Sequence, residues 1–302
     1  MSTTLKNLRK AVDLLTPSDG KHQTSIPGVY CIKFSKPGKR NKGNWRACLG
    51  IIVQGTKEIV VGRQRFRFDD IHYIATPIDL PVISRIASAT EDKPFLSVVI
   101  ELDMQLLSEV STLIEKIHVK SDQTSQRSVF TGKVNEKLLE AVSRLIQLLQ
   151  SPEDSRALAP LVIKEVLYHF LKGEDGPAIQ QFVRLGSKMH KISEAIHSMR
   201  SQLSNDVDVE VLAKKANMSR SAFFKSFKEI TAVSPIQYQK RLRLVEARRL
   251  MIDQGETAEG SAYKVGYKSA SQFSREYSRM FGNSPLKDAM KIKQSGERGY
   301  QI

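Results

Sequence analysis

SRSAFFKSFKEITAVSP (residues 219–235) and SASQFSREYSRMFGNSP (residues 269–285) present one pattern twice, fifty positions apart. A serine opens each copy, aromatic residues recur four positions apart inside it, and a Ser-Pro pair closes it. A short alanine-containing segment and then a turn residue, Asn217 or Gly266, precede each copy. This order predicts a helix, a tight turn and a second helix, twice over, which is a paired helix-turn-helix.

Each position in the pattern has a physical reason. Small residues, Ala213 and Ala262, let the two helices of a unit cross closely, and the turn residues leave the helical region. Ser219 and Ser269 are suited to cap the second helices. Aromatic residues at i and i+4 form the apolar inner face of each second helix. These inner residues are Phe223, Phe227, Phe273 and Tyr277.

The opposite face of each second helix is left free to meet a DNA groove. Lys225 and Arg275 can each reach a guanine or a phosphate, and the planar fork of Arg275 makes it the better base reader. Phe224 either meets a thymine methyl group or packs against the helix that follows. The predicted DNA-binding residues are Arg220, Ser221, Phe224, Lys225 and Lys228 in the first copy and Ala270, Ser271, Ser274, Arg275 and Arg279 in the second.

A glycine- and proline-free run, residues 236–251, joins the copies. Its apolar residues lie at helical intervals, so it predicts a single linking helix of roughly 24 Å. Such a helix can hold two recognition helices about one DNA turn apart, so that both enter successive major grooves of a duplex.

The preceding part of the chain has the pattern of strands followed by helices. Short β-branched or alternating runs are separated by Gly, Pro, Asp and Lys, which predicts a small barrel or double-sheet roll. Apolar faces over 136–150 and 161–172 predict two helices, which either pack on this domain or form a dimer surface. The expected strands are 28–34, 47–54, 58–61, 65–68, 72–76 and 96–102. We therefore expect an α+β chain with a sensing and dimerisation domain over residues 1–186 and a DNA-binding domain over 187–302.

Composition supports a polyanionic partner. The formal charge is +15, and residues 187–302 carry 21 Lys+Arg against 12 Asp+Glu. Phosphate contacts by these cations should make affinity fall steeply with salt. The N-terminus lacks the apolar core of a secretory signal, and no run of eighteen apolar residues could span a membrane, so we expect a cytoplasmic protein of a bacterium.

The sequence predicts neither an enzyme nor a metal or cofactor site. A metal-dependent barrel of this kind needs a His-x-His pair with further ligands, and no two of the six histidines are separated by one residue. Neither the serine nucleophile elbow nor the phosphate-cradling glycine-rich loop occurs. The two cysteines, Cys31 and Cys48, are too few for a disulfide scaffold.

Residues 208–293 resemble the DNA-binding domain of the AraC/XylS transcriptional regulators. The matching residues include Leu212-Ala213, Met218-Ser219 and Ser234-Pro235 in the first unit, Arg241-Leu242-Arg243 in the linking run, and Val265-Gly266-Tyr267 with Phe281 to Pro285 in the second. The sequence departs from the family at Gly260-Ser261, where a larger aliphatic and an isoleucine are usual, and at Ala270, a position that often reads bases. The resemblance implies a promoter-binding regulator, usually an activator that contacts RNA polymerase.

The front domain resembles the amino-terminal domain of one AraC-type subgroup. The matching residues run from Leu49 to Lys57 and continue at Val60-Val61-Gly62, Ile78 to Pro81 and Leu158 to Leu161. The resemblance implies a cupin-like barrel that senses a small-molecule effector and forms a homodimer. Ala47-Cys48 and Trp45-Arg46 depart from the subgroup near the expected barrel mouth, so the identity of the effector does not carry over.

Tyr30, Trp45 and His72 are the candidate effector-binding residues. Trp45 has an ordinary alternative as a core side chain, and His72 has one as a partly buried polar residue. Cys31 and Cys48 lie on strands that could be neighbours, and they are either inert packing or a redox-sensing pair.

Three functions remain open at this point. The first is a sequence-specific regulator of transcription controlled by a small apolar or carbonyl-type effector. The second is the same DNA-binding unit governed by cysteine oxidation or a partner protein, with a barrel filled by its own side chains. The third is a sequence-tolerant architectural DNA binder.

Overall fold

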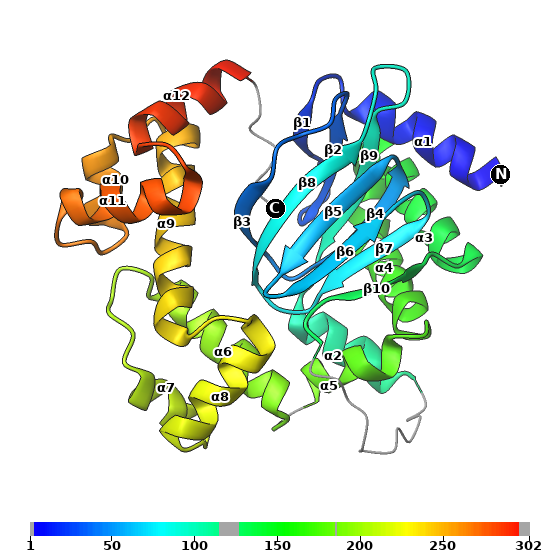
Figure 1. Ribbon diagram of the computed structural model, residues 1–302. Helices are drawn as coiled ribbons and strands as arrows, with labels where there is room; N and C mark the ends of the chain where they lie inside the picture. Colours follow the sequence, from blue (N-terminus) through cyan, green and yellow to red (C-terminus); the bar gives the residue numbers. More distant parts are fainter. Residues whose placement is uncertain (1–2, 115–126, 185, 296–302) are drawn as a thin grey trace.

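The computed structural model describes residues 3–114, 127–184 and 186–295. Figure 1 shows a two-layered β structure backed by helices, with a group of helices beside it that contains the C-terminal third of the chain. The fold is thus α+β followed by all-α, as the sequence predicts.

The β structure consists of two antiparallel sheets. The six-stranded sheet has the order β1-β2-β9-β4-β7-β10, and the four-stranded sheet has the order β3-β8-β5-β6. The two sheets face each other. Because successive side chains of a strand point to opposite faces, every second residue of a strand points toward the other sheet. The strands are β1 (Gly20–Gln23), β2 (Val29–Phe34), β3 (Asn41–Trp45), β4 (Cys48–Gln54), β5 (Thr56–Val61), β6 (Gln64–Phe68), β7 (His72–Thr76), β8 (Leu80–Ser88), β9 (Phe95–Glu101) and β10 (Phe130–Lys133).

Glycine is required at the corner between β4 and β5. Gly55 has φ +87°, and a Cβ there would lie 2.9 Å from the Cα of Phe95. An L side chain is disfavoured both by this backbone conformation and by the space. The chain can therefore pass from one sheet to the other at this point.

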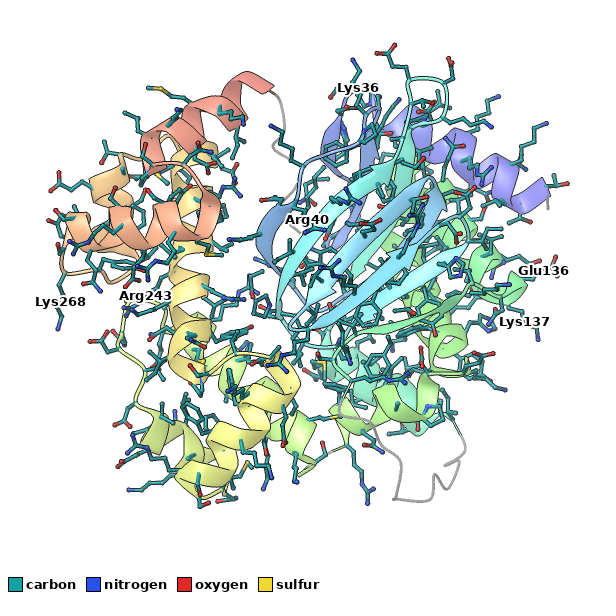
Figure 2. All side chains as sticks on the ribbon, in the orientation of Figure 1. Lys36, Arg40, Glu136, Lys137, Arg243 and Lys268 are labelled. Atoms are coloured by element: carbon teal, nitrogen blue, oxygen red, sulfur yellow. The ribbon has the colours of Figure 1, made fainter. Side chains whose placement is uncertain are left out.

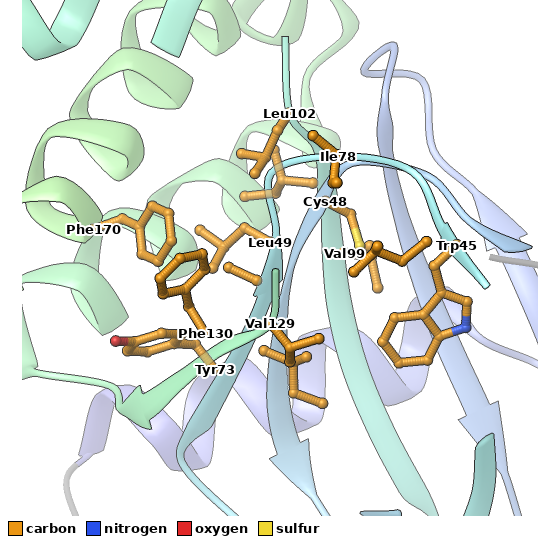
Figure 3. Packing of buried hydrophobic residues seen from close by; sticks show 14 of the residues in the cluster. Trp45, Cys48, Leu49, Tyr73, Ile78, Val99, Leu102, Val129, Phe130 and Phe170 are labelled. Atoms are coloured by element: carbon orange, nitrogen blue, oxygen red, sulfur yellow. The ribbon is translucent and has the colours of Figure 1, made fainter. Parts of the chain in front are cut away.

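Helices cover the outer face of the six-stranded sheet (Figure 1). The ring of Phe170 meets that of Tyr73 edge-on at 5.4 Å, and Phe130 meets Phe182 in the same way at 5.8 Å. Figure 3 shows the Tyr73, Phe130 and Phe170 rings gathered on this side and Trp45 away from them. The helices of this part are α1 (Thr3–Leu15), α2 (Met104–Thr112), α3 (Glu136–Gln147) with a 3-10 turn η1 (Leu148–Gln150), α4 (Pro152–Leu171) and α5 (Gly176–Val183).

Seven helices form the remaining described part of the chain. The core of the first helix-turn-helix is continuous with the core of the β structure, whereas the second has a core of its own. The first unit is therefore the more firmly joined to the barrel. The helices are α6 (Lys188–Ser201), α7 (Val209–Lys215), α8 (Arg220–Thr231), α9 (Pro235–Asp253), α10 (Ala258–Lys264), α11 (Ala270–Phe281) and α12 (Pro285–Ser295).

The structure corrects some expectations about the β structure. All six expected strands are present, but β1, β3, β8 and β10 were missed. The β3 sequence, Asn-Lys-Gly-Asn-Trp, has little strand preference of its own and pairs because β8 lies beside it. The helix expected over 161–172 begins nine residues earlier, at Pro152, where Ser151 caps it. The strands of Cys31 and Cys48 are not neighbours, because β9 lies between β2 and β4.

Candidate nucleic-acid interface and its junction with the barrel

The first helix-turn-helix, α7 and α8, has the predicted turn and cap. Asn217 adopts a positive φ of +48° between the helices. The Ser219 hydroxyl accepts a hydrogen bond from the backbone N–H of Ala222. Phe223 and Phe227 are fully buried, and the Phe227 ring meets that of Tyr238 in α9 at 5.4 Å. These inner contacts fix the orientation of α8.

The second unit, α10 and α11, repeats this arrangement. Gly266 has φ +90°, and a Cβ there would lie 2.2 Å from the carbonyl oxygen of Ser204, so only glycine fits. Ser269 accepts from the N–H of Gln272, and Phe273 and Tyr277 are buried. The first helix of this unit forms despite the departure from the family at Gly260-Ser261, with Thr257 as its cap.

Buried arginines of α9 connect this helix to both units. The guanidinium group of Arg243 donates to the carbonyl oxygens of Leu203, Ser204 and Asn205, in the connection that leads into α7. Arg248 donates to both carboxylate oxygens of Asp288 in α12, at 2.8 and 3.3 Å. Bidentate pairs of this kind restrict orientation as well as distance. Over its nineteen residues α9 is a rod of about 28 Å.

The outward faces of α8 and α11 carry the predicted DNA-binding residues. Phe224 is 38 % exposed, which places it on the open face of α8. Arg220 pairs with Glu210 of α7 at 2.9 Å, and within the described residues Lys225, Lys228, Arg275 and Arg279 form no ion pair. Eight of the ten residues are exposed, namely Arg220, Ser221, Phe224, Lys225, Lys228, Ser271, Arg275 and Arg279, and the half-buried two are Ala270 and Ser274. The cations are thus available to phosphates or base edges.

Between the two sheets the barrel is nearly filled by its own side chains. Trp45, 3 % exposed, closes over a space that Cys48 and Val99 line from the other sheet. The free volume there is about 20 Å³, room for a single water molecule. Figure 3 shows Trp45 beside Cys48 and Val99. An occupant larger than water requires Trp45 to move.

Lys57 is a buried cation in this space that the sequence reasoning did not identify. Its Nζ lies 4.5 Å from the centre of the Trp45 ring and 5.8 Å from that of Phe95. Burial lowers the pKa of the Lys57 ammonium group from 10.5 to about 8. The signal was present in the strand pattern, because Lys57 shares its face of β5 with Ile59 and Val61, which are inward and apolar.

The other two candidate effector residues differ in position. Tyr30 is 1 % exposed, pairs across the sheet with the lining residue Val99, and has a buried hydroxyl without a hydrogen-bond partner in the described residues. His72 pairs across the sheet with another lining residue, Ile52, and its ring is 2.7 Å from the Asp69 carboxylate. Of the three candidates Trp45 lines this space, whereas Tyr30 and His72 each lie across the sheet from a residue that lines it.

The two cysteines are buried free thiols on opposite faces of the six-stranded sheet. Cys31 pairs with Val98 of β9 and Cys48 pairs with Glu101 of β9, so the two cysteines lie three residues apart along β9. Burial raises the pKa of the Cys31 thiol to about 12 and that of Cys48 to about 11. Low accessibility and little thiolate character weigh against a redox role for this pair.

Asp79, in the turn between β7 and β8, joins the barrel to the helical part. One carboxylate oxygen accepts from the N–H of Ala47 at 2.9 Å, and the other pairs with Arg200 of α6. Its backbone carbonyl accepts from the Tyr238 hydroxyl of α9 at 2.7 Å. Ala47 follows Trp45 by two residues, so one turn connects the closure of the barrel to the linking helix.

Within the described residues there is no group of three or more histidine, cysteine, aspartate or glutamate side chains that could hold a metal ion. No helix in the described parts of the chain is long and apolar enough to cross a membrane.

Known protein families match both parts of the chain. Residues 25–178 match the family described as the AraC-type transcriptional regulator N-terminus, and residues 212–288 match a helix-turn-helix domain family. The transcriptional activator RhaS of Salmonella schwarzengrund is 24% identical over 160 residues, which cover 51% of this chain and 55% of RhaS. The transcriptional regulator ArgR of Pseudomonas aeruginosa is 27% identical over 149 residues, which cover 49% of this chain and 45% of ArgR. The chain thus spans about half the length of the curated relatives it matches.

Solved structures of ToxT from Vibrio cholerae share the fold over most of the chain. ToxT bound to an unsaturated fatty acid gives a TM-score of 0.58 at 14% identity, covering 87% of this chain and 94% of ToxT. ToxT bound to (E)-4-(8-methylnaphthalen-1-yl)but-3-enoic acid gives a TM-score of 0.62 at 14% identity, and the match covers 87% of this chain and 98% of ToxT. At this identity the likeness concerns the fold. Because a single family model spans half of its length, and the second covers the paired helix-turn-helix, the chain belongs to the AraC-type transcriptional regulators.

Proposed function

We propose that this protein is a sequence-specific DNA-binding regulator of transcription whose DNA-binding unit is controlled by a small molecule in the barrel. The observation that carries the proposal is the repeated helix-turn-helix, in which α8 and α11 present exposed cations from one linking helix. A single chain would place both recognition helices in successive major grooves. Division of the chain at residues 186 and 187 separates the sensing part from the DNA-binding part.

Base recognition is assigned to the outward residues of α8 and α11. Arg275 reads a guanine through its two donor groups, Lys225 contacts a guanine or a phosphate, and Phe224 meets a thymine methyl group. The exposure of Phe224 supports this role over packing against α9. Arg279, Lys228 and Arg220 hold the phosphates.

The effector is a small apolar molecule with a polar group that faces Lys57. ToxT, which shares the fold, has been solved with an unsaturated fatty acid and with a butenoic acid derivative bound. Here Lys57 supplies a buried amine among aromatic rings, a site suited to an anionic or carbonyl group. Entry of such a molecule displaces Trp45, because the space beneath it holds about one water.

Displacement of Trp45 reaches the DNA-binding unit through Asp79. The turn that follows Trp45 is held by the Asp79 carboxylate, and the same residue binds α6 and α9. A ligand can shift an equilibrium only by binding its two states with different affinities. The differential contact here is the Trp45 closure, which is present in one state and broken in the other.

Promoter activation, contact with RNA polymerase and dimerisation complete the proposal. RhaS is named as an activator. The helix α4 leaves Leu158 and Leu161 exposed to 43 % and 62 %, which supports this helix as the dimer surface. A protein that acts on bacterial promoters works in the cytoplasm, and neither catalysis nor a cofactor is part of this function.

The test is selection of upstream fragments of the source genome by the purified chain at two salt concentrations. A regulator retains a few fragments with a shared bipartite motif at the higher salt, and Arg275→Ala releases them. Arg127→Ala is the matched control, because Arg127 is exposed and lies outside both α4 and the helix-turn-helix units. If all fragments are retained equally and all are lost at the higher salt concentration, the protein is an architectural DNA binder and the proposal is wrong.

A further inference from the structure

The outer face of the four-stranded sheet is strongly basic. Register places Lys42, Ile83, Val60 and Arg65 in one row across the strands and Arg85, Glu58 and Arg67 in the next. Directly paired residues share a face of an antiparallel sheet. Four arginines, with Arg40 at the margin, and a single acid line a hollow of about 330 Å³ on this face, and Lys42 adds a fifth cation beside it.

Glu58 neutralises only part of this charge. Its carboxylate accepts from Arg85 at 2.7 Å, and the hydrogen bond from Arg85 holds the pKa of Glu58 below its usual range. Arg67 is more distant, at 3.5 Å, and its side chain is 69 % exposed. Arg65 forms no ion pair with another residue of the described ranges. Figure 1 shows no described helix over this face, in contrast to the six-stranded sheet.

This face lies beside the two recognition helices. A Cβ on Gly62, in the turn between β5 and β6, would lie 2.7 Å from the Cβ of Ala232, the residue that ends α8. At the other edge, β3 packs against α9 and α11, and Asn41 accepts from Arg248 at 3.1 Å. In Figure 1 the four-stranded sheet is the nearer layer of the barrel, and α11 lies on the near side of α9. Figure 2 places Arg40 between the barrel and the C-terminal helices.

We propose that the outer face of the β3-β8-β5-β6 sheet binds the phosphate backbone of the DNA that α8 and α11 engage. A duplex that receives both recognition helices runs along α9, and this sheet flanks it. Phosphate is the anion that a field of arginine and lysine side chains fits. The barrel thereby contributes directly to DNA affinity. This proposal rests on the proposed function.

The contacts should be independent of base sequence. Phosphate contacts release counterions, and each contributes roughly 0.9 to the slope of log affinity against log salt. Loss of two contacts makes the slope of log affinity against log salt shallower by about 1.8. The ratio of the DNA affinity of the parent to that of the variant therefore falls about tenfold between 50 and 200 mM salt. Specific and random DNA should lose affinity alike, because no base is read.

The experiment compares Arg65→Gln/Arg67→Gln with Lys133→Gln/Lys137→Gln in the full-length chain. Both pairs are exposed and both remove two charges, but Lys137 lies on the side of the barrel away from the C-terminal helices (Figure 2). Affinity for a retained promoter fragment and for a random duplex is measured from 50 to 200 mM salt. Thermal unfolding confirms that both variants are folded.

A shallower slope in the arginine variant, with the parental slope in the lysine variant, supports the proposal. Equal slopes in all three proteins overturn it, while specific binding by the parent still upholds the proposed function. If slopes are equal but transcription in vitro falls in the arginine variant, the face binds an acidic protein instead. A parent chain that distinguishes no fragment from random DNA refutes the proposed function, and the salt slopes on random DNA then decide this contact by themselves.

Discussion

Removal of the Tyr238 hydroxyl tests whether the barrel and the linking helix are coupled through Asp79. In Tyr238→Phe the ring keeps its contact with Phe227 at 5.4 Å, and the 2.7 Å hydrogen bond to the Asp79 carbonyl is lost. Tyr238 is 0 % and Asp79 9 % exposed. A buried carbonyl that loses its donor costs about 1–3 kcal/mol. The equilibrium constant for opening of the contact between the barrel and α9 should therefore rise roughly 5- to 150-fold.

Hydrogen exchange at the Ala47 amide measures this opening. This N–H donates to the Asp79 carboxylate at 2.9 Å, within the junction itself. Where closing is faster than exchange, the rate follows the opening equilibrium, so Tyr238→Phe should accelerate exchange at Ala47 by the same factor. Tyr277→Phe is the control, because its hydroxyl donates to Asp288 at 2.8 Å, inside the second helix-turn-helix unit.

Two results would refute the coupling. Unchanged exchange at Ala47 in Tyr238→Phe would show that this bond does not hold the junction. Equal acceleration by Tyr238→Phe and Tyr277→Phe would show that the change is a general loss of stability. Acceleration confined to Tyr238→Phe is the outcome that we expect.

Three further predictions concern recognition, the barrel and assembly. Arg275→Ala should weaken binding to the specific site by about 1–3 kcal/mol with a smaller effect on random DNA, measured by fluorescence anisotropy; an equal loss on both would assign Arg275 to a phosphate. Lys57→Met should raise the free energy of unfolding at pH 7 by at most about 3 kcal/mol, because a folded-state pKa of about 8 against 10.5 means that the fold disfavours the charged amine. The free energy of unfolding of the parent should rise relative to that of the variant between pH 8 and 10.5, because in this range only the unfolded chain still holds the proton on Lys57. A variant that is less stable at every pH would show that the contact of Lys57 with Trp45 is stabilising instead. Leu161→Asp should shift a dimer toward monomer in sedimentation velocity, and an unchanged distribution would place the dimer surface elsewhere.

The helix-turn-helix units were predictable because their signals are local. Caps at Ser219 and Ser269, the turns at Asn217 and Gly266, and aromatic residues four positions apart all act within one or two helical turns. The structure confirms each of them. Strand β3 was not predictable in the same way, because its residues are polar and pair only when β8 is already in place.

Lys57 shows why the barrel interior was harder to anticipate. The alternation in β5 marks Lys57 as inward, but a lysine in such a pattern is equally compatible with an edge or a strand end. Only the packing of Trp45 and Phe95 around its amine, from two other strands, makes it a buried and destabilised cation.

The amino-acid sequence by itself determined the paired helix-turn-helix, the linking helix, the strand-rich front and the excess of positive charge, because each arises from neighbouring residues or from composition. Tertiary structure alone decided which distant groups meet. It separated Cys31 from Cys48 by a strand, brought the Asp79 carbonyl to Tyr238 across 159 residues, and gathered the cations of three strands on one sheet face. These outcomes depend on strand order, register and the docking of helices, which are set by the packing of the whole chain and carry no local signature.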